Sequence, residues 1–391
     1  MNIHKDDIET YVHERMINEN DSYEKIYEII YNEILEIYDL DENKKNEVYV
    51  IQKILQNIIH SKKNKKENIQ RRKKQLNKLK KLKLPAQRTP EWYKMRKGKL
   101  TASSLASALN KCHFQSRDEL ILSKIEEQPF LTNPIIEWGV KYEEIAILFY
   151  EELFNVKVLD FGLIPHPNFS IFGASPDGIC DDTGDDEYVS RMVEIKCPPK
   201  RKFTKTCPLH YQMQVQGQLE VCDLDECDFF QVKIEEYDDF NQYAEDVFIN
   251  DDNIIPGRTN LNYPKGVTVS YRKGGEDRLS YIYPKLNLTG DEYKQWIENE
   301  KNKIELNGDE FIECRWWKIT RYECTLIQRN KLWWINTIED ILYFHKDLFD
   351  YTNDPEKLKE LKRRIDENKK RKKKIDTPPQ NEFQLISDDE E

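Results

Sequence analysis

The 391-residue sequence predicts an α/β (α+β) fold, in which a mixed central sheet is flanked by helices. Three observations predict it. Between about residues 87 and 236, helical and extended patterns alternate as they do in α/β domains. Apolar residues before this region recur at helical spacing, and an aromatic, alternating stretch follows it. The apolar fraction of 38% suffices for one core domain with additions at both ends.

The N-terminal part, residues 1–84, is predicted to be a helical extension. Its apolar positions repeat at helical spacing: Ile26, Ile29, Ile30, Ile34 and Ile37. Residues 61–83 then contain ten Lys, two Arg and one Glu, a local balance of +11, and Pro85 is expected to end this basic helix. The basic segment is open to a functional interpretation, an arm that follows nucleic-acid phosphates, and to a bland one, either a solvated helix or a patch like a nuclear-import signal.

The core, residues 85–236, should contain three long helices and four strands. The helices are expected at residues 117–127, 135–154 and 209–221. The strands are expected at residues 156–163, 170–179, 188–197 and 227–235, with a turn at Thr183-Gly184 between the second and third strands.

The C-terminal part is expected to form an α+β extension that packs on the core over residues 237–352. It includes helices at 292–303 and 332–349 and a strand at 310–326. Residues 353–391 should be a basic helix, with a block of basic residues at 369–374, followed by a disordered acidic tail.

Composition excludes several classes of protein. The net charge of −11 argues against a basic coat over the whole surface. Eight cysteines without any C-x-x-C pair predict neither a zinc site nor an iron-sulfur cluster. No long apolar run or apolar signal core occurs, so we expect a soluble, intracellular protein without a membrane partner.

The most informative segment is the strand-like run from Val193 to Pro198. Residues two apart in a strand share a face, so Glu194 and Lys196 should project together while Val193 and Ile195 face the core. Asp177 lies in a Pro-Asp-Gly turn, where a hairpin would bring a second carboxylate to Glu194. Two acids and a lysine suit Mg²⁺-dependent cleavage of a phosphodiester, because a hard cation takes oxygen ligands and its bound water must lose a proton.

Five segments in order share a pattern with a known family. They read W-x-x-x-R-x-G-x-x-T-A-S at residues 92–103, G-x-x-Y-E-x-x-A at 139–146, S-P-D-G at 175–178, E-I-K-C-P at 194–198 and Q-V-Q at 214–216. Over about residues 88–235 the chain resembles the lambda-type exonuclease family, also called YqaJ-like viral recombinases. That family belongs to the PD-(D/E)XK nuclease superfamily, so the resemblance implies its restriction-endonuclease-like core.

The resemblance also implies roles for individual residues. Asp177 and Glu194 would bind the catalytic metal with the Ile195 carbonyl, and Glu143 would complete the site. Lys196 would hold the attacking water and stabilise charge on phosphorus, and Gln214 would orient Lys196 or the water. The DNA 5′-phosphate would be held by Arg96, Ser103 and Ser175, with Arg201 or Lys202 as a further basic contact.

Each of these residues also has a purely structural interpretation. Glu143 would be a solvated charge, Asp177 a turn former and Ser103 a helix cap. Glu194 and Lys196 would form a surface ion pair of little energetic value. These alternatives are favoured one at a time, but together, in this order, they become improbable.

The resemblance therefore implies a Mg²⁺-dependent DNA exonuclease, with Mn²⁺ as a substitute, that acts 5′ to 3′ on 5′-phosphorylated duplex ends. We expect a large-DNA-virus protein of recombination, repair or replication, located in the host cytoplasm or nucleus. Expected partners are DNA, further copies of the chain in a ring, and a single-strand-annealing or recombination protein. Two alternatives remain: an endonuclease or RecB-like nuclease of CRISPR adaptation, and a non-catalytic scaffold that binds DNA ends.

Overall fold

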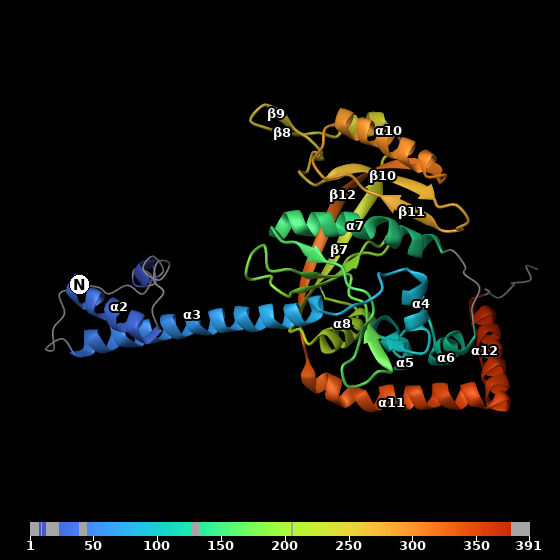
Figure 1. Ribbon diagram of the computed structural model, residues 1–391, viewed down its shortest axis with the longest axis horizontal. Coiled ribbons are helices and arrows are strands. Elements are labelled where there is room, and N and C mark those ends of the chain that lie inside the picture. Colours follow the sequence, from blue (N-terminus) through green and yellow to red (C-terminus); the bar gives the residue numbers. More distant parts are fainter. Residues whose placement is uncertain are drawn as a thin grey trace, which may run out of the picture. The chain divides into compact units, whose positions relative to one another are not determined.

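The computed structural model describes residues 8, 10–12, 23–38, 45–126, 133–204 and 206–376. The chain divides into two compact units, Met1–Lys81 and Leu82–Glu391 (Figure 1). The predicted acidic tail, residues 377–391, lies outside the described residues.

The first unit contains the helices α2 (Tyr23–Ile37) and α3 (Lys45–Lys80). Both helices contribute to one apolar cluster, whose buried members include Ile30, Ile34, Ile51, Leu55 and Ile58. The second half of α3 carries most of the basic segment and ends at Lys80, five residues before Pro85.

The second unit is built on a seven-stranded mixed sheet with the strand order β11-β10-β12-β7-β6-β5-β2. Within it, β6 and β7 pair in parallel and the other neighbours pair antiparallel. Its strands are β2 (Val158–Leu159), β5 (Gly178–Cys180), β6 (Met192–Lys196), β7 (Glu226–Glu236), β10 (Lys265–Arg272), β11 (Leu279–Ile282) and β12 (Glu310–Gln328). A second sheet has the order β1-β4-β3 and consists of β1 (Leu100–Thr101), β3 (Ile164–Pro165) and β4 (Phe172–Ala174). The strands β8 (Phe248–Asn250) and β9 (Asn253–Ile255) form a separate hairpin.

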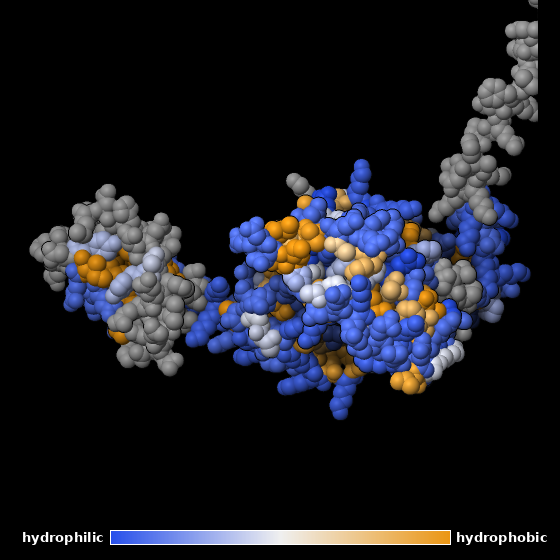
Figure 2. All heavy atoms as spheres, turned by 90° about the horizontal axis from the view of Figure 1, so that it is seen from above, coloured by the Kyte–Doolittle hydropathy of each residue, from blue (hydrophilic) through white to orange (hydrophobic). Residues whose placement is uncertain are grey.

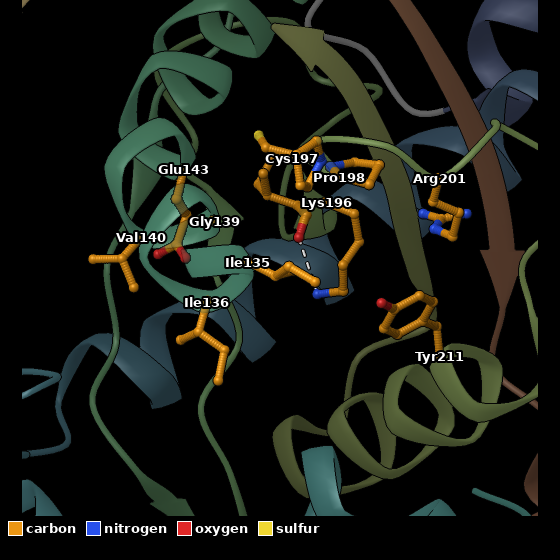
Figure 3. A pocket seen from close by; sticks show the side chains of 12 residues that line it. Ile135, Ile136, Gly139, Val140, Glu143, Lys196, Cys197, Pro198, Arg201 and Tyr211 are labelled. Carbon is orange, nitrogen blue, oxygen red and sulfur yellow. Dashed lines mark hydrogen bonds between the residues drawn. The ribbon is translucent and has the colours of Figure 1, made fainter. Parts of the chain in front are cut away.

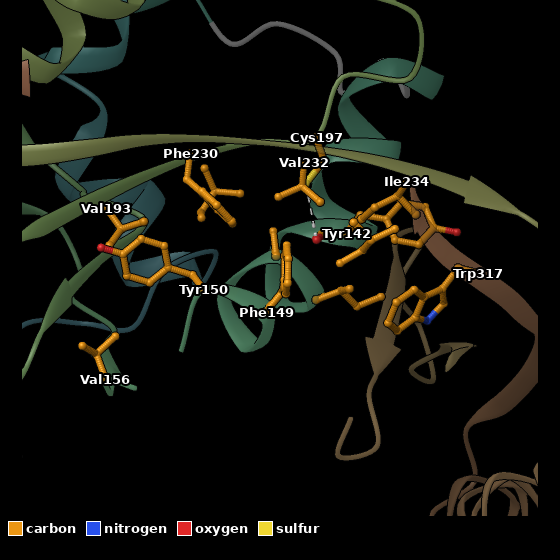
Figure 4. Close-up of a cluster of buried hydrophobic side chains, with 14 of the residues drawn as sticks. Tyr142, Phe149, Tyr150, Val156, Val193, Cys197, Phe230, Val232, Ile234 and Trp317 are labelled. Atoms are coloured by element: carbon orange, nitrogen blue, oxygen red, sulfur yellow. Dashed lines mark hydrogen bonds between the residues drawn. The ribbon is translucent and has the colours of Figure 1, made fainter. Parts of the chain in front are cut away.

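Helix α7 (Pro134–Phe154) covers one face of the large sheet. Asn133 caps its first turn and Pro134 occupies the first helical position, where the missing N–H costs nothing. The buried side of α7 packs on β6, β7 and β12 (Figure 4) through Tyr142, Ile145, Phe149, Tyr150, Val193, Ile195, Phe230, Val232 and Trp317. Val193 and Ile195 therefore face the core, as the alternation of β6 predicts.

Helix α8 (Leu209–Cys222) covers the opposite face, because Glu194 and Phe229 of the sheet contact it while their neighbours contact α7. Gly217 lets α8 approach its surroundings closely, since an added Cβ would lie 3.1–3.3 Å from Phe172, Leu105 and Ala102. The remaining helices of this side are α4 (Pro90–Arg96), a 3₁₀ turn (Ala102–Ser104), α5 (Leu105–Ala108), α6 (Arg117–Ile125), α11 (Lys331–Asn353) and α12 (Pro355–Asp376).

Among the C-terminal strands, β10, β11 and β12 extend the core sheet, because β12 pairs with both β7 and β10. Helix α10 (Gly290–Leu306) and the short α9 (Phe240–Glu245) pack on them around a cluster that includes Tyr243, Val267, Val269, Tyr293, Ile297 and Trp316. The predicted mixed sheet flanked by helices, with a helical N-terminal and an α+β C-terminal extension, is confirmed.

Three strand predictions in the core were wrong in extent, and in one of them the stretch 188–197 contains just β6 (Met192–Lys196). The stretch 156–163 contains just the two-residue strand β2, because the chain leaves the sheet and forms β3 in the smaller one. The stretch 170–179 is divided at Ser175-Pro176-Asp177 into β4 and β5, which belong to different sheets. Proline lacks the N–H that a ladder needs, so it interrupts the strand at this point.

The surface seen in Figure 2 is mostly hydrophilic, with separate apolar patches. None of the helices in the described ranges combines the length and the apolarity of a membrane span.

Candidate active site

The side chains of Glu194 and Lys196 lie on the α8 face of β6. Glu194 is 0% exposed, so it is a buried acid and the interpretation as a surface ion pair was wrong. The Lys196 ammonium contacts the Glu194 carboxylate, lies 2.9 Å from the Ile195 carbonyl oxygen and 4.0 Å from Asp177 Oδ2. Three oxygens from three residues thus converge on one cationic nitrogen.

Asp177 reaches this point through the register of β5 and β6. Gly178 pairs with Val193, so the preceding Asp177 lies opposite Glu194 at the end of the antiparallel ladder. Its Oδ2 accepts a hydrogen bond of 2.7 Å from the Ile195 N–H, which fixes the carboxylate beside the strand. The predicted proximity of Asp177 and Glu194 follows from β5 and β6 themselves; the loop between these strands, residues 181–191, lies at the far end of both.

Glu143 enters from α7 and lines the same cavity as Ile195 and Lys196. Its carboxylate forms a 2.8 Å ion pair with Arg88, a residue that sequence reasoning missed. No motif marks Arg88; it lies in a loop before α4 with a positive φ of 66° and meets Glu143 through tertiary packing.

Two glutamines of α8 hold the Glu194 carboxylate. Gln214 Nε2 donates to Oε1 at 2.6 Å and Gln218 Nε2 donates to Oε2 at 2.8 Å. Gln218 also donates to the Ser175 carbonyl at 3.4 Å. Sequence reasoning missed Gln218, although its position four residues after Gln214 places both amides on one helix face.

The electrostatics of the site reflect an excess of buried carboxylates. Burial, and next the Glu194 carboxylate, raise the pKa of Asp177 well above its ordinary value. Burial also raises the pKa of Glu143, against the opposing effect of Arg88. Burial would lower the pKa of Lys196, but the Glu194 and Asp177 carboxylates outweigh it and raise that pKa, so the amine stays charged.

A cavity of about 350 Å³ opens beside Lys196 (Figure 3). Glu143 and the exposed Ile135 and Ile136 line it from α7, and Tyr211 lines it from α8. Arg201 also lines it, and its Nη2 donates to Gln231 at 2.8 Å. Lys202, the alternative basic contact, is exposed.

The residues expected to hold a phosphate form a second group next to this cavity. Arg96 Nη2 lies 3.3 Å from Ser103 Oγ, and the guanidinium stacks 4.2 Å above the Trp92 ring. Trp92 Nε1 in turn donates to Ser175 Oγ at 3.1 Å. Trp92 therefore connects Ser175 to Arg96, which contacts Ser103 directly.

Lys124 of α6 belongs to the same group, although sequence reasoning missed it. Its Nζ donates to the Arg96 carbonyl at 3.3 Å. Burial, and next the Arg96 charge, lower the pKa of Lys124 to about 8. Neither cation is paired with a carboxylate among the described residues, so the group is a concentrated positive charge that an anion would stabilise.

The donor set fits a hard divalent cation. Carboxylate and carbonyl oxygens are the ligands that Mg²⁺ prefers, and here Asp177, Glu194 and the Ile195 carbonyl already converge on the Lys196 nitrogen. Within the described ranges, no three His, Cys, Asp or Glu side chains lie close enough together to hold a metal without rearrangement.

Residues 91–225 match the family model of the YqaJ-like viral recombinase domain.

Comparison with curated proteins gives a viral relative. The chain is 33% identical over 290 residues to an uncharacterized protein of Acanthamoeba polyphaga mimivirus, an alignment that covers 67% of this chain and 52% of the relative. The chain thus spans about half the length of the curated relative it matches.

Among solved structures, the alkaline exonuclease of Laribacter hongkongensis aligns at 21% identity over 73% of this chain and 100% of its own, with a TM-score of 0.37. A phage-related exonuclease from Haemophilus somnus aligns at 14% identity over 64% of this chain and 93% of its own, with a TM-score of 0.33.

Proposed function

We propose that this chain is a divalent-metal-dependent DNA exonuclease that removes nucleotides from 5′-phosphorylated duplex ends. The observation that carries the proposal is the convergence of Asp177, Glu194 and the Ile195 carbonyl on one cationic position, beside a separate cationic group that contains Arg96. The YqaJ-like domain at residues 91–225 supports the nuclease class.

Asp177, Glu194 and the Ile195 carbonyl would hold the metal, with Glu143 as a further oxygen ligand. A bound Mg²⁺ or Mn²⁺ would supply Lewis acidity and lower the pKa of a coordinated water. Lys196, which the neighbouring carboxylates keep protonated, would donate to the phosphate oxygen on which charge develops. Gln214 and Gln218 would keep Glu194 in position, because each occupies one of its two oxygens.

In the reaction, the water oxygen forms a bond to phosphorus and the bond from phosphorus to the 3′-oxygen of the first nucleotide breaks. The leaving 3′-oxygen takes up a proton and the first nucleotide departs as a 5′-monophosphate. The next nucleotide is left with a 5′-phosphate. Each cycle therefore regenerates the anion that Arg96, Ser103 and Ser175 would bind, which favours degradation in one direction.

The end requirement is tested with two forms of one plasmid. In the presence of Mg²⁺, the linearised duplex should be degraded to mononucleotides while the covalently closed circle survives. Rapid cutting of the circle would favour an endonuclease. Binding of linear DNA without hydrolysis in Mg²⁺ or Mn²⁺ would favour a non-catalytic scaffold that recognises ends.

A further inference from the structure

Four rings form a continuous cluster at the beginning of α8. The centroids of His113 and Phe114 lie 3.7 Å apart, and His210 meets them edge to face at 5.4 and 5.6 Å. Tyr211 continues the row, 4.1 Å from His210. The Phe114 side chain is 72% exposed, and a large aromatic that turns outward at the end of such a row gains little from folding.

The row begins inside the candidate active site. Tyr211 lines the cavity (Figure 3), with the Lys196 ammonium 5.0 Å and the Arg201 guanidinium 5.7 Å from its ring centre. The rings thus lead from the reacting groups to the surface, with two cations at the inner end. Aromatic faces combined with basic side chains are how proteins hold unpaired nucleic acid without regard to sequence.

Three residues on one face of α8 indicate the order in which a DNA strand would meet these groups. His210, Gln214 and Gln218 are four residues apart, so they lie on one face about 6 Å apart along the helix. Gln218 contacts the carbonyl of Ser175, Gln214 contacts the buried acid Glu194, and His210 contacts the exposed rings. A strand whose 5′-phosphate lies near Ser175 would therefore pass Glu194 and then reach His113 and Phe114.

We propose that His113 and Phe114, supported by His210, form a stacking platform for the nucleobase on the 3′ side of the scissile phosphodiester. This inference rests on the proposed function, since it takes the 5′-phosphate at Ser175 as its starting point. In structural terms, the platform holds the second nucleotide of the attacked strand while the first is removed. It binds any base, because every base offers a π face.

A double-mutant cycle between protein and DNA tests the platform. The full-length protein binds an end-labelled hairpin duplex with one 5′-phosphorylated end, in chelator so that no metal supports cleavage, and affinity is measured by fluorescence anisotropy. An abasic site at the second nucleotide should weaken binding to the unmodified protein about tenfold. Phe114→Ala should weaken binding to intact DNA to a similar extent, and the abasic site should then have little further effect.

Three variants separate stacking from other causes. Phe114→Trp should retain affinity and the abasic penalty, whereas Phe114→Leu, which keeps apolar area without a ring, should lose most of both. Phe349→Ala removes a phenylalanine of α11 that is 63% exposed and should change neither. Thermal melting of each variant establishes that the fold is intact.

The outcomes distinguish the platform from the proposed function. If the protein cleaves linear DNA but the effects of Phe114→Ala and of the abasic site are independent, the platform is wrong and the proposed function stands. Coupling to a different nucleotide, such as the sixth, would overturn the assigned position. No binding of any DNA end by the unmodified protein would overturn both proposals.

Discussion

At the residue scale, the site depends on how Glu194 is held. This acid is fully buried, yet each of its oxygens has an amide donor and one also contacts Lys196. A buried carboxylate is costly unless hydrogen bonds or an ion pair satisfy it. Gln214 and Gln218 therefore hold the carboxylate in the geometry that a cation requires.

Removing one of these donors should impair catalysis more than binding. Gln218→Ala leaves Glu194 Oε2 without its 2.8 Å donor, and the loss of a hydrogen bond to a charged group costs about 1.5–3 kcal/mol. We expect a higher metal concentration for half-maximal activity and a lower kcat, measured by metal titration of exonuclease activity. DNA affinity in chelator should not change. Equal loss of binding and activity would contradict the positioning role.

Lys124 should make phosphate binding by the group around Arg96 depend on pH. Its pKa of about 8 lies below the ordinary lysine value, so the amine is charged at pH 7 and loses its charge as the pH rises through 8. The preference for a 5′-phosphorylated over an unphosphorylated end should therefore decrease between pH 7 and 9. The ratio of the two Kd values, measured in chelator, reports this preference.

Lys124→Arg provides the control, because arginine stays charged throughout this range. The ratio should then be independent of pH. Arg96→Ala should reduce the ratio at every pH. An unchanged pH dependence in Lys124→Arg would show that another group titrates.

At the element scale, the conformation around Asp177 depends on Gly178. A Cβ at Gly178 would lie 2.1 Å from Val158 Cγ1 of β2, so the close pairing of β5 and β2 excludes any side chain there. Gly178→Ala should destabilise the fold by about 1–3 kcal/mol. Gly139→Ala is the matched control, because nothing lies within 4 Å of a Cβ at this helical position. That change should be neutral or stabilise by about 0.5–1 kcal/mol, as followed by urea unfolding.

The sequence predicted the features that depend on local residue patterns alone. The period of two along β6 placed Glu194 and Lys196 on one face, and the helical periods located α7 and α8. It did not predict that Pro176 divides one extended stretch between two sheets, because both halves have strand-like residues. Nor did it predict Arg88, Lys124 or Gln218 as neighbours of the site, since their contacts arise when elements distant in sequence pack together.

At the scale of the whole molecule, the long β12 joins the C-terminal part to the core. This strand pairs along eleven residues with β7 and along eight with β10, so β10, β11 and β12 complete the large sheet. Expectations of a ring of several copies and of a recombination partner stay predictions.

The basic segment of residues 61–83 should contribute affinity without sequence preference. Replacing Lys62, Lys63, Lys65 and Lys66 with glutamine should reduce the slope of log K against log salt by up to about 3.6, because each phosphate contact contributes about 0.9. The slope is measured by anisotropy from 50 to 300 mM salt. A slope equal to that of the unmodified protein would indicate that this segment is solvated and does not follow the phosphates.

The most direct test of the account is hydrolysis of a linear 5′-phosphorylated duplex in Mg²⁺ by Asp177→Ala and by Lys196→Ala. Each variant should lose hydrolysis almost completely while it keeps its fold and most of its DNA affinity in chelator. Asp291→Ala, which removes a carboxylate that is 97% exposed, should keep full activity. Undiminished hydrolysis by both site variants would contradict the assignment of the active site.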